Sequence, residues 1–463
     1  MGDIKTDVST PSAAYAARVP DWNMIEALLG GTRAMRDAGT AYLPKHRAEE
    51  DEDHRYRLSR AILHNYFKST VRHLAGKIFA KEPVLQNDVP PQIREFCEDL
   101  DMQGSHLAIM APDALRGALS KGIHYLLVEY PRTDGIRTLA DERASGARPY
   151  VVSLPAESVI GVRLSPDGRT IIQARIRENA TVPDGAYGET TAERVRVLSP
   201  GAYEVWERVR KGQTEEWAMV ENGTTSLPRV PLVPLYGERT GAFLCRPPLL
   251  DLAYMNVAYW QDYSDYANAI TVASFPILAA SGWKPEEDPK VVLSPFRFLS
   301  MTDPGGKFYY LEHAGTAINA GRTRLQDLKV DMAMEGLQFQ MPRATGSDVT
   351  ATESEISNAN STSDLRRMSI GVKDALENVL QIMAEWIGLK DGGSIQLQGA
   401  FSMPGESAED IKSLMQMQMG GIITKKTLLA EAVRRGLLPE EFDAEAELEM
   451  VDSEGPDLTE PAA

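Results

Sequence analysis

Residues 318–353 read INAGRTRLQDLKVDMAMEGLQFQMPRATGSDVTATE. Apolar side chains recur at intervals of three and four in the first part, which predicts a helix over residues 318–339. The segment 341–350 has no apolar pattern and contains a proline and a glycine, so we expect a polar loop there. A long helix is then expected over residues 352–388, and at 1.5 Å per residue its length would be about 55 Å.

The long helix changes character along its length. The segment 353–367 is almost entirely polar, whereas the second half is apolar on one face. That face consists of Val372, Leu376, Val379, Leu380, Met383 and Ile387. Because an isolated helix is marginal and an apolar face must be covered, a helix of this kind needs neighbours at both ends.

Another helix and an insert precede this region. Apolar and aromatic residues follow helical spacing over 249–275, and Pro276 ends that pattern. The following residues, 276–316, consist of short apolar runs broken by prolines and glycines, which predicts a small β-rich insert.

Two side-chain patterns on the first of these helices allow two interpretations each. Tyr259, Tyr263 and Tyr266 could stack on nucleic-acid bases, but tyrosines at helical spacing favour a packing face. Asp262 and Asp265 could form an acid–base pair, but a spacing of three favours a solvated helix face.

The N-terminal part is predicted to be helical up to a buried strand. A helical pattern starts after Asp21, a plausible N-cap, and helices continue to about Lys81. Leu58, Ile62 and Tyr66 are at helical spacing within this block. A further helical stretch is expected over 92–119. The apolar run 124–130 predicts a buried strand.

Residues 148–236 change to a β pattern. Six strands are expected in an antiparallel arrangement, over 150–154, 158–163, 170–176, 203–210, 213–220 and 230–236. Turns are predicted at 166–168, 211–212 and 221–223, where glycine follows an aspartate, lysine or asparagine.

The C-terminal part is predicted to hold one strand, 394–400, and two helices, 408–419 and 427–435, before an acidic tail. Residues 421–436 loosely resemble a helix-turn-helix fragment. An acidic run follows it directly and would repel phosphate, so we favour a helix packed in an all-α subdomain.

The composition narrows the class of protein. The chain has 463 residues, enough for several domains, with 66 acidic and 49 basic side chains and a net charge of −17. A free-standing, sequence-specific DNA-binding protein is usually basic, so that class is disfavoured. Two cysteines cannot build a disulfide framework, which fits a reducing, cytoplasmic-type compartment. The N-terminus lacks a signal-peptide pattern, and the uncharged stretch 266–283 is too polar for a membrane span.

Motifs that carry chemistry are missing. The sequence contains no G-x-G-x-x-G, no P-loop, no H-E-x-x-H and no G-x-S-x-G. His46, His54, His64 and His73 are eight to ten residues apart, and we expect most of them on helical or loop surfaces. The sequence therefore predicts no catalytic residue, no metal and no cofactor, and a protein that is not an enzyme.

The order of elements resembles bacteriophage portal proteins, the head-to-tail connectors of tailed phages. Helix, small insert, returning helix, polar loop and long helix correspond to stem, clip, stem, tunnel loop and wing helix. Residues 22–44 with 56–83 resemble the start of one portal subgroup, 247–253 resemble the start of the stem helix, and 350–353 resemble the segment after the tunnel loop. The similarity covers roughly residues 20–450.

The resemblance implies an α+β, portal-like fold. Its parts would be a flexible tail (1–20), a helical and then β-stranded wing (21–246), a stem helix (247–275), a clip (276–316), a second stem helix (317–340), a tunnel loop (341–350), a long wing helix (351–390), an α-helical crown (391–450) and an acidic tail (451–463).

The resemblance also implies a function and partners. It predicts a ring of about twelve copies at one capsid vertex of a virion, assembled in the host cytoplasm. Double-stranded DNA would pass through its channel without sequence specificity during packaging and ejection. The terminase large subunit and head-completion or adaptor proteins would dock on it, and it would meet the major capsid or scaffold proteins; no membrane is implied. Another virion structural protein, such as a head–tail adaptor, is the main alternative, and a soluble enzyme with a β-rich substrate domain is the third.

Three groups of residues are candidates under this resemblance. The tunnel loop facing DNA would be Met341, Pro342, Arg343, Ala344, Thr345, Gly346, Ser347, Asp348 and Val349. Channel lining or pairing between subunits would involve Arg322, Arg324, Asp327, Lys329, Asp331 and Glu335 on the second stem helix. The clip interface would involve Trp283, Phe296, Phe298, Phe308 and Tyr309.

Overall fold

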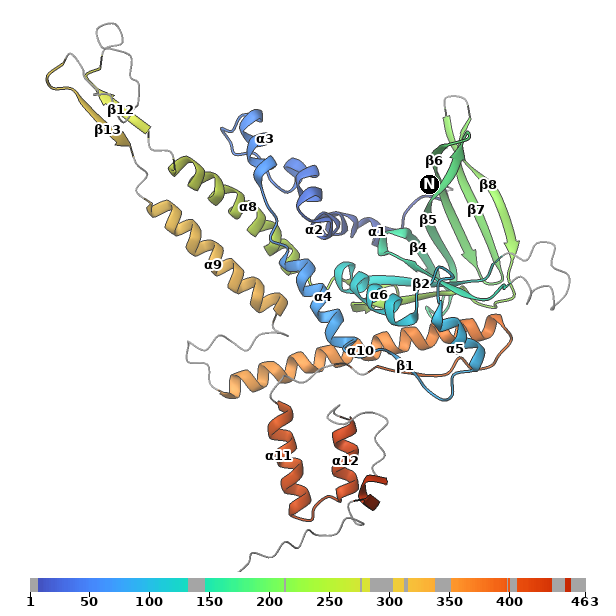
Figure 1. Ribbon diagram of the computed structural model, residues 1–463. Coiled ribbons are helices and arrows are strands. Elements are labelled where there is room, and N and C mark those ends of the chain that lie inside the picture. Colours follow the sequence, from blue (N-terminus) through green and yellow to red (C-terminus); the bar gives the residue numbers. More distant parts are fainter. Residues whose placement is uncertain are drawn as a thin grey trace, which may run out of the picture. The chain divides into compact units, whose positions relative to one another are not determined.

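A computed structural model describes residues 7–131, 146–211, 214–274, 277–283, 303–311, 315–337, 351–397, 399, 406–434 and 446–450. The chain divides into two units, Met1–Gln398 and Gly399–Ala463. Both units contain helices, and the described strands belong to the first (Figure 1). The expected mixture of helices and antiparallel sheet is therefore confirmed.

The first unit begins with a series of helices. They are α1 (Ala13–Ala16), α2 (Val19–Asp37), the 3-10 helix Gly39–Ala41, α3 (Asp51–Arg60), α4 (Tyr66–Ile78), α5 (Pro91–Glu98) and α6 (Leu107–Lys121).

Asp21 is not the N-cap of α2, contrary to the prediction. The helix already starts at Val19, and Pro20 in its first turn has the fixed φ that suits a helix start. Asp21 lies within that first turn, where its carboxylate accepts a hydrogen bond of 2.7 Å from the hydroxyl of Tyr254.

The helical spacing expected for Leu58, Ile62 and Tyr66 is interrupted, because α3 ends at Arg60. The chain becomes extended at Ala61, and Ile62 is 52% exposed. A new helix, α4, starts after Asn65, whose side-chain oxygen caps it by accepting from the backbone N–H of Lys68.

The helix predicted over 92–119 is two helices, α5 and α6. Between them Asp99 and Asp101 accept hydrogen bonds from the backbone N–H groups of Gly104, Gln103 and Ser105. Such side-chain bonds compete with the helical ladder, and Gly104 has a φ of 93° that continues no helix.

A three-stranded antiparallel sheet follows the helices. Its order is β3 (Tyr150–Leu154), β2 (Ile123–Glu129), β9 (Leu232–Tyr236). The predicted strand over 124–130 is thereby confirmed as the central one, and its residues are buried almost throughout. Ile123, Tyr125 and Leu127 belong to the main apolar core.

A five-stranded antiparallel meander forms the largest sheet. Its strands, in order, are β4 (Val159–Leu164), β5 (Ile171–Asp184), β6 (Gly188–Ser199), β7 (Ala202–Lys211) and β8 (Thr214–Thr224). The turn at 166–168 is confirmed by a 2.8 Å bond from the Gly168 N–H to the Ser165 carbonyl. The turn at 211–212 includes a residue outside the described ranges.

Two features of this sheet differ from the prediction. Strand β6 was not expected, because its first half is exposed and only Val195, Val197 and Leu198 are buried. The segment 221–223 is not a turn but lies within β8, where Gly223 pairs with Tyr203. A Cβ at Gly223 would lie 2.5 Å from the Tyr203 ring, so glycine is needed there for a close contact.

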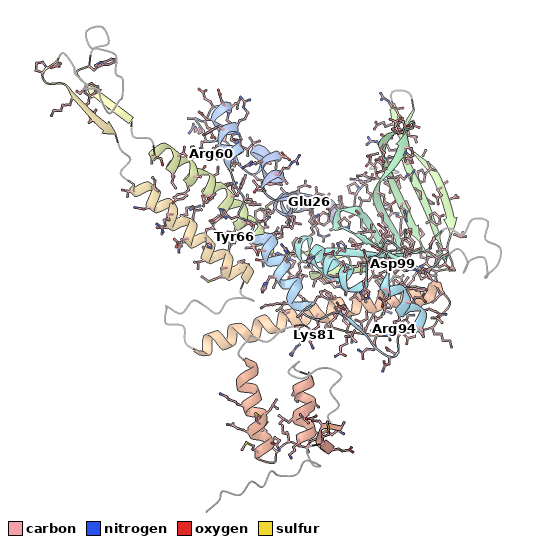
Figure 2. The ribbon with its side chains drawn as sticks, in the orientation of Figure 1. Glu26, Arg60, Tyr66, Lys81, Arg94 and Asp99 are labelled. Atoms are coloured by element: carbon pink, nitrogen blue, oxygen red, sulfur yellow. The ribbon has the colours of Figure 1, made fainter. Side chains whose placement is uncertain are left out.

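Two smaller strand pairs also belong to the first unit, one local and one between distant parts of the chain. β10 (Glu238–Gly241) pairs with β11 (Leu244–Arg246), and β1 (Val84–Leu85) pairs with β14 (Ile395–Gln396). The strand predicted over 394–400 is therefore only two residues long as described. Arg94, labelled in Figure 2, donates to the carbonyls of Leu85 and Gln86 beside it.

The long helix α10 (Ala351–Trp386) confirms the prediction for 352–388. Its apolar second half is buried and contacts β9, β2, α4 and α5. Arg229 binds the Glu385 carboxylate through two bonds of 2.9 Å each and Asn378 through one of 3.1 Å. This ties the end of the helix to the segment that leads into β9.

The second unit contains α11 (Glu406–Met419) and α12 (Lys425–Arg434), which confirm the two predicted C-terminal helices. None of its described side chains is buried. Met415, Met417, Met419 and Ile422 are all more than 40% exposed. Within the described part of the whole chain, no helix combines the length and the apolar character needed to cross a bilayer.

One of the predicted surface histidines is buried. His54 is 5% exposed, and its Nε2 lies 2.8 Å from the Leu43 carbonyl oxygen. His46, His64 and His73 are exposed, as expected. The polar sequence around His54 gave no sign of burial, because the covering residue, Leu43, comes from outside the helix.

His124 should make the stability of the first unit depend on pH. Its ring is 8% exposed, Nε2 lies 2.7 Å from the Ser153 hydroxyl, and Nδ1 has no hydrogen-bond partner among the described residues. Burial, with a smaller effect of nearby Lys121, lowers the pKa of His124 from 6.5 to about 4. Between pH 6.5 and pH 4 the unfolded chain therefore binds a proton that the folded chain does not. Stability decreases as the pH is lowered through this range.

As the pH falls from 6.5 to 4, we expect the free energy of unfolding to decrease by on the order of 3 kcal/mol, at 1.36 kcal/mol per pKa unit. Thermal unfolding midpoints at pH 7, 6, 5 and 4.5 should fall less steeply for His124→Gln than for the unmodified chain. His64→Gln, which removes an exposed ring, should keep the original slope. Equal slopes for all three proteins would contradict the assignment to His124.

Candidate assembly site: the α8–α9 helix pair

Helices α8 (Leu250–Ala273) and α9 (Thr316–Leu337) lie side by side and run in opposite directions (Figure 1). Both were predicted from their spacing. Three contacts set their alignment: Gly336 lies against Leu252, Arg324 against Asp262 and Gly321 against Tyr266. Leu325 and Met332 of α9 are buried in this contact region.

Glycines allow the close approach of the two helices. A Cβ at Gly336 would lie 2.4 Å from Leu252 Cδ2, and one at Gly321 would lie 3.3 Å from the Tyr266 ring. On α8, Trp260 is fully buried and Tyr259 is 7% exposed. The α8–α9 pair is therefore packed along its length rather than only joined at one end.

The tyrosine stripe of α8 is largely a packing face, as favoured. Tyr259 stacks on Tyr263 with ring centres 6.1 Å apart, and His64 meets both rings edge-on. Tyr66, labelled in Figure 2, meets Tyr259 edge-on at 5.3 Å. Burial raises the pKa of Tyr259 to about 12, so this hydroxyl stays protonated at neutral pH.

Asp262 and Asp265 do not pair with each other and are partly exposed, as favoured, but each of them is held in an ion pair. Asp262 Oδ2 accepts from Arg324 Nε at 2.7 Å. Asp265 Oδ1 accepts from Arg57 Nη1 at 3.0 Å and lies 3.1 Å from His46 Nε2. The two carboxylates thus connect α8 to opposite neighbours, α9 and the segment around α3.

Arg57 is the centre of a buried ionic cluster that the sequence did not reveal. Its side chain is 3% exposed, and it donates to both Glu49 oxygens, at 2.7 and 2.8 Å, as well as to Asp265 and to the Pro44 carbonyl. The hydrogen bonds from Arg57 lower the pKa of Glu49 from 4.5 to about 2. This cluster connects α3 and the segment before it to α8.

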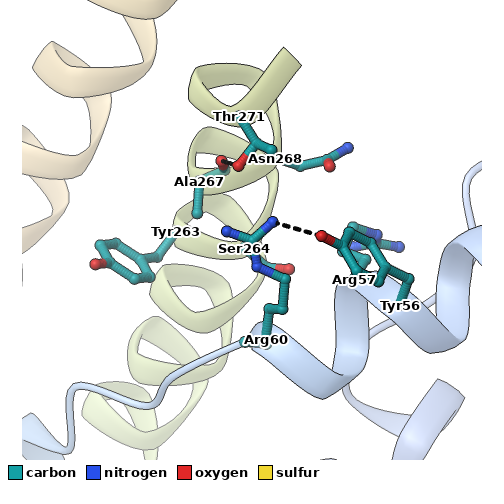
Figure 3. A pocket seen from close by; sticks show the side chains of 9 residues that line it. Tyr56, Arg57, Arg60, Tyr263, Ser264, Ala267, Asn268 and Thr271 are labelled. Carbon is teal, nitrogen blue, oxygen red and sulfur yellow. Dashed lines mark hydrogen bonds between the residues drawn. The ribbon is translucent and has the colours of Figure 1, made fainter. Parts of the chain in front are cut away.

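A small hollow lies beside this cluster, between α3 and α8 (Figure 3). Its volume is about 30 Å³, enough for one water molecule but for no substrate. The Ser264 hydroxyl beside it is buried without a hydrogen-bond partner among the described residues. Arg60 Nη1 donates to the Tyr56 hydroxyl at 3.1 Å at its edge.

The charged residues of α9 fall on two edges. Asp327, Asp331 and Glu335 follow one another at intervals of four and form one exposed stripe. Arg322 and Lys329 are seven residues apart, also exposed, and lie on the opposite side of the buried row that faces α8. Arg324 lies on the acidic side, where Asp262 pairs with it. Apart from Arg324, the mixture of charges seen in the sequence is therefore separated in space, with an acidic edge and a basic edge.

The predicted β-rich insert contains an antiparallel strand pair, β12 (Ile277–Ser281) with β13 (Lys307–Leu311). Phe308 and Tyr309 are neighbours on β13, so their side chains point to opposite faces of the pair. Tyr309 is 49% exposed, and Trp283 is half-buried. Within the predicted aromatic interface, Phe308 and Tyr309 therefore lie on opposite faces of the strand pair. Phe296 and Phe298 lie outside the described residues.

All residues of the predicted tunnel loop, 341–350, also lie outside the described residues, so their role stays a prediction. Within the described part of the chain, no group of three or more His, Cys, Asp or Glu side chains is arranged to hold a metal ion.

Comparison with known families identifies one matching segment. Residues 248–387 match the family described as "Domain of unknown function (DUF4055)". The match starts just before α8 and ends just after α10, so it includes the helix pair, the insert and the long helix. No curated protein matches the chain.

Chains of solved structures are also similar to this one. A chain of "Neck of empty GTA particle computed with C6 symmetry" is 14% identical at a TM-score of 0.41, over 80% of this chain and 89% of that chain. A chain of "Virion of native gene transfer agent (GTA) particle" is 13% identical with the same TM-score and coverage. A chain of "Neck of native GTA particle computed with C12 symmetry" is 13% identical at 0.41, over 78% and 87%.

Proposed function

We propose that this chain is a portal-type subunit that closes into a ring around a channel for double-stranded DNA. The observation that carries the proposal is the α8–α9 pair with charges of opposite sign on the two edges of α9. A closed ring needs two different, complementary surfaces on each subunit, because each copy meets its neighbours head to tail. An acidic edge on one copy and a basic edge on the next meet this requirement.

The order of elements supports the same assignment. The sequence resembles portal proteins in having a helix, a small insert, a returning helix, a polar segment and a long helix, and these helices and the strand pair occupy the expected residues. Under the proposal, residues 247–275 and 317–340 are the stem, 276–316 the clip, 341–350 the tunnel loop, 351–390 the long wing helix and 391–450 the crown.

The proposed partners follow from these parts. The clip would receive the terminase large subunit during packaging and head-completion or adaptor proteins afterwards. The channel would hold DNA without reading its sequence, and the net charge of −17 suits a lining over which phosphates slide. The ring would occupy one capsid vertex of a virion and contact the major capsid or scaffold proteins.

The exposed residues of the second unit also favour an assembled state. Four large apolar side chains of α11 and the following turn are exposed, and none of the described residues there is buried. Exposed apolar side chains gathered on one segment are typical of a surface that packs against a partner. Neighbouring copies would cover them.

Native mass spectrometry and negative-stain electron microscopy of the full chain test the proposal. We expect closed rings of about twelve subunits with a central hole. Because the proposed contacts between copies are ionic, the rings should become less abundant between roughly 0.1 and 1 M salt, as the Debye length falls from about 10 Å to 3 Å. A chain that stays monomeric at high concentration and low salt would refute the proposal, and small oligomers without a hole would favour a different structural protein.

A further inference from the structure

One face of α4 carries basic and neutral polar side chains and no carboxylate. It consists of Asn65, Lys68, Ser69, Arg72 and His73, which repeat at helical spacing, with Arg116 of α6 beside them. We call these six residues the basic face. In Figure 2 the label Tyr66 marks the first residue of α4, and the label Lys81 lies three residues after its end. Such a concentration of basic groups contrasts with the net charge of −17.

The basic face lines a pocket, and three of its six side chains have no partner among the described residues. The six residues line a pocket of about 530 Å³. Ser69, Arg72 and His73 are exposed, and their side chains make no hydrogen bond or ion pair to the other described residues. Lys68 Nζ donates one hydrogen bond to the Leu29 carbonyl at 2.9 Å, which leaves two of its N–H groups available. Arg116 pairs with Asp113. The side chains of Ser69, Arg72 and His73 therefore line this pocket without an acceptor among the described residues.

The opposite face of α4 explains why these residues are presented rigidly. Phe67, Val71, Leu74 and Ile78 are buried, so the helix cannot turn about its axis. Asn65 is held in place by its cap on Lys68 N–H and by its bond to the Leu28 carbonyl. A second hollow of about 460 Å³ shares Lys68, Arg72 and Arg116 with the first and is lined also by apolar side chains such as Leu29 and Val71.

The chemistry of the lining indicates the class of ligand. Lysine, arginine, serine and asparagine are the side chains that contact phosphate oxygens in protein–DNA complexes. No apolar side chain lines the first pocket, whereas a protein partner needs an apolar centre in the interface. A phosphate backbone needs no such centre, because its binding is driven by charge neutralisation.

We propose that the basic face binds the phosphate backbone of double-stranded DNA, as a contact separate from the α8–α9 pair and from residues 341–350. It goes beyond the proposed channel, since it needs neither a ring nor DNA passing through one. Each phosphate neutralised by Lys68 or Arg72 would release counterions, so binding here is sequence-independent and sensitive to salt.

The test uses the full chain and a covalently closed DNA minicircle, which cannot thread end-on through a channel. Binding is measured by fluorescence anisotropy between 50 and 300 mM salt. Lys68→Gln/Arg72→Gln should weaken binding at 50 mM salt roughly tenfold and lower the slope of log K against log salt by about 1.8. Arg163→Gln/Arg169→Gln removes the same charge from exposed sites on and beside β4 and should change neither.

The outcomes separate this inference from the proposed function. Unchanged binding and slope in Lys68→Gln/Arg72→Gln would overturn the inference, whether or not rings form. Poly-glutamate that binds as tightly as DNA and loses affinity equally in that variant would overturn it in favour of an acidic protein partner. Native mass spectrometry on the same samples reports ring formation independently, and a retained melting midpoint shows that the variant is folded.

Discussion

Reversing the acidic edge of α9 should prevent rings from closing. In Asp327→Lys/Asp331→Lys, two exposed carboxylates become cations and would face Arg322 and Lys329 of the neighbouring copy. Exposed pairs are worth well under 1 kcal/mol each, but like charges placed opposite one another add a repulsive cost. We expect about 2 kcal/mol per interface, which lowers the association constant roughly thirtyfold at every contact in the ring.

The complementary variant makes the test specific. Arg322→Glu/Lys329→Glu has two acidic edges and should also stay unassembled. An equimolar mixture of the two variants should restore rings with alternating subunits, because each acidic edge again meets a basic one. Asp184→Lys/Glu189→Lys, which reverses two exposed acids at the ends of β5 and β6, should assemble normally. Native mass spectrometry distinguishes these results, and a mixture that fails to form rings would remove α9 from the interface.

Replacing Arg57 should have the largest effect on local stability. Arg57→Met leaves the Glu49 carboxylate, which is 9% exposed, without its two charged hydrogen bonds. Removing one partner of a buried pair typically costs about 3–5 kcal/mol, because the other charge remains buried. We expect amide hydrogens of α3 to exchange at least roughly 100-fold faster at pH 7, the factor that corresponds to about 3 kcal/mol.

The pH dependence checks the cause. The folded-state pKa of Glu49 is lowered to about 2, so its contribution to stability is present above pH 4.5 and is lost as the pH falls toward 2. The difference between Arg57→Met and the unmodified chain should therefore shrink as the pH falls below 4.5. Arg55 is an exposed arginine on the same helix. Arg55→Met should change the opening free energy measured by amide exchange by less than about 0.5 kcal/mol. A similar effect of both substitutions would show that the ionic cluster is not what holds α3.

The regular helices could be predicted because their evidence is local. Spacings of three and four over 249–275, 318–339 and 352–388 lie within single segments, and α8, α9 and α10 start and end within about three residues of those bounds. The central strand β2 is apolar along nearly its whole length, and it was predicted for the same reason. Strand β6 was missed because its first half faces solvent and carries no alternation.

Glycine and ionic contacts required the folded chain. Gly223 reads as a turn residue, but its function is to let the Tyr203 ring approach from the neighbouring strand. Arg57 and Asp265 are 208 residues apart, and no spacing rule connects them. Asp262 and Asp265 therefore looked like a solvated pair until the arginines from α9 and α3 were placed beside them.

The sequence by itself determined the order of helices, insert and long helix, the excess of acid, and the mixture of charges on residues 322–335. Each of these is a property of neighbouring residues or of the whole composition. Only the tertiary structure decided that the charges of α9 form two opposite edges, because an edge is defined by the row of residues that packs against α8. The same holds for the basic face, since its donors from α4 are joined by Arg116 only when α6 packs beside that helix.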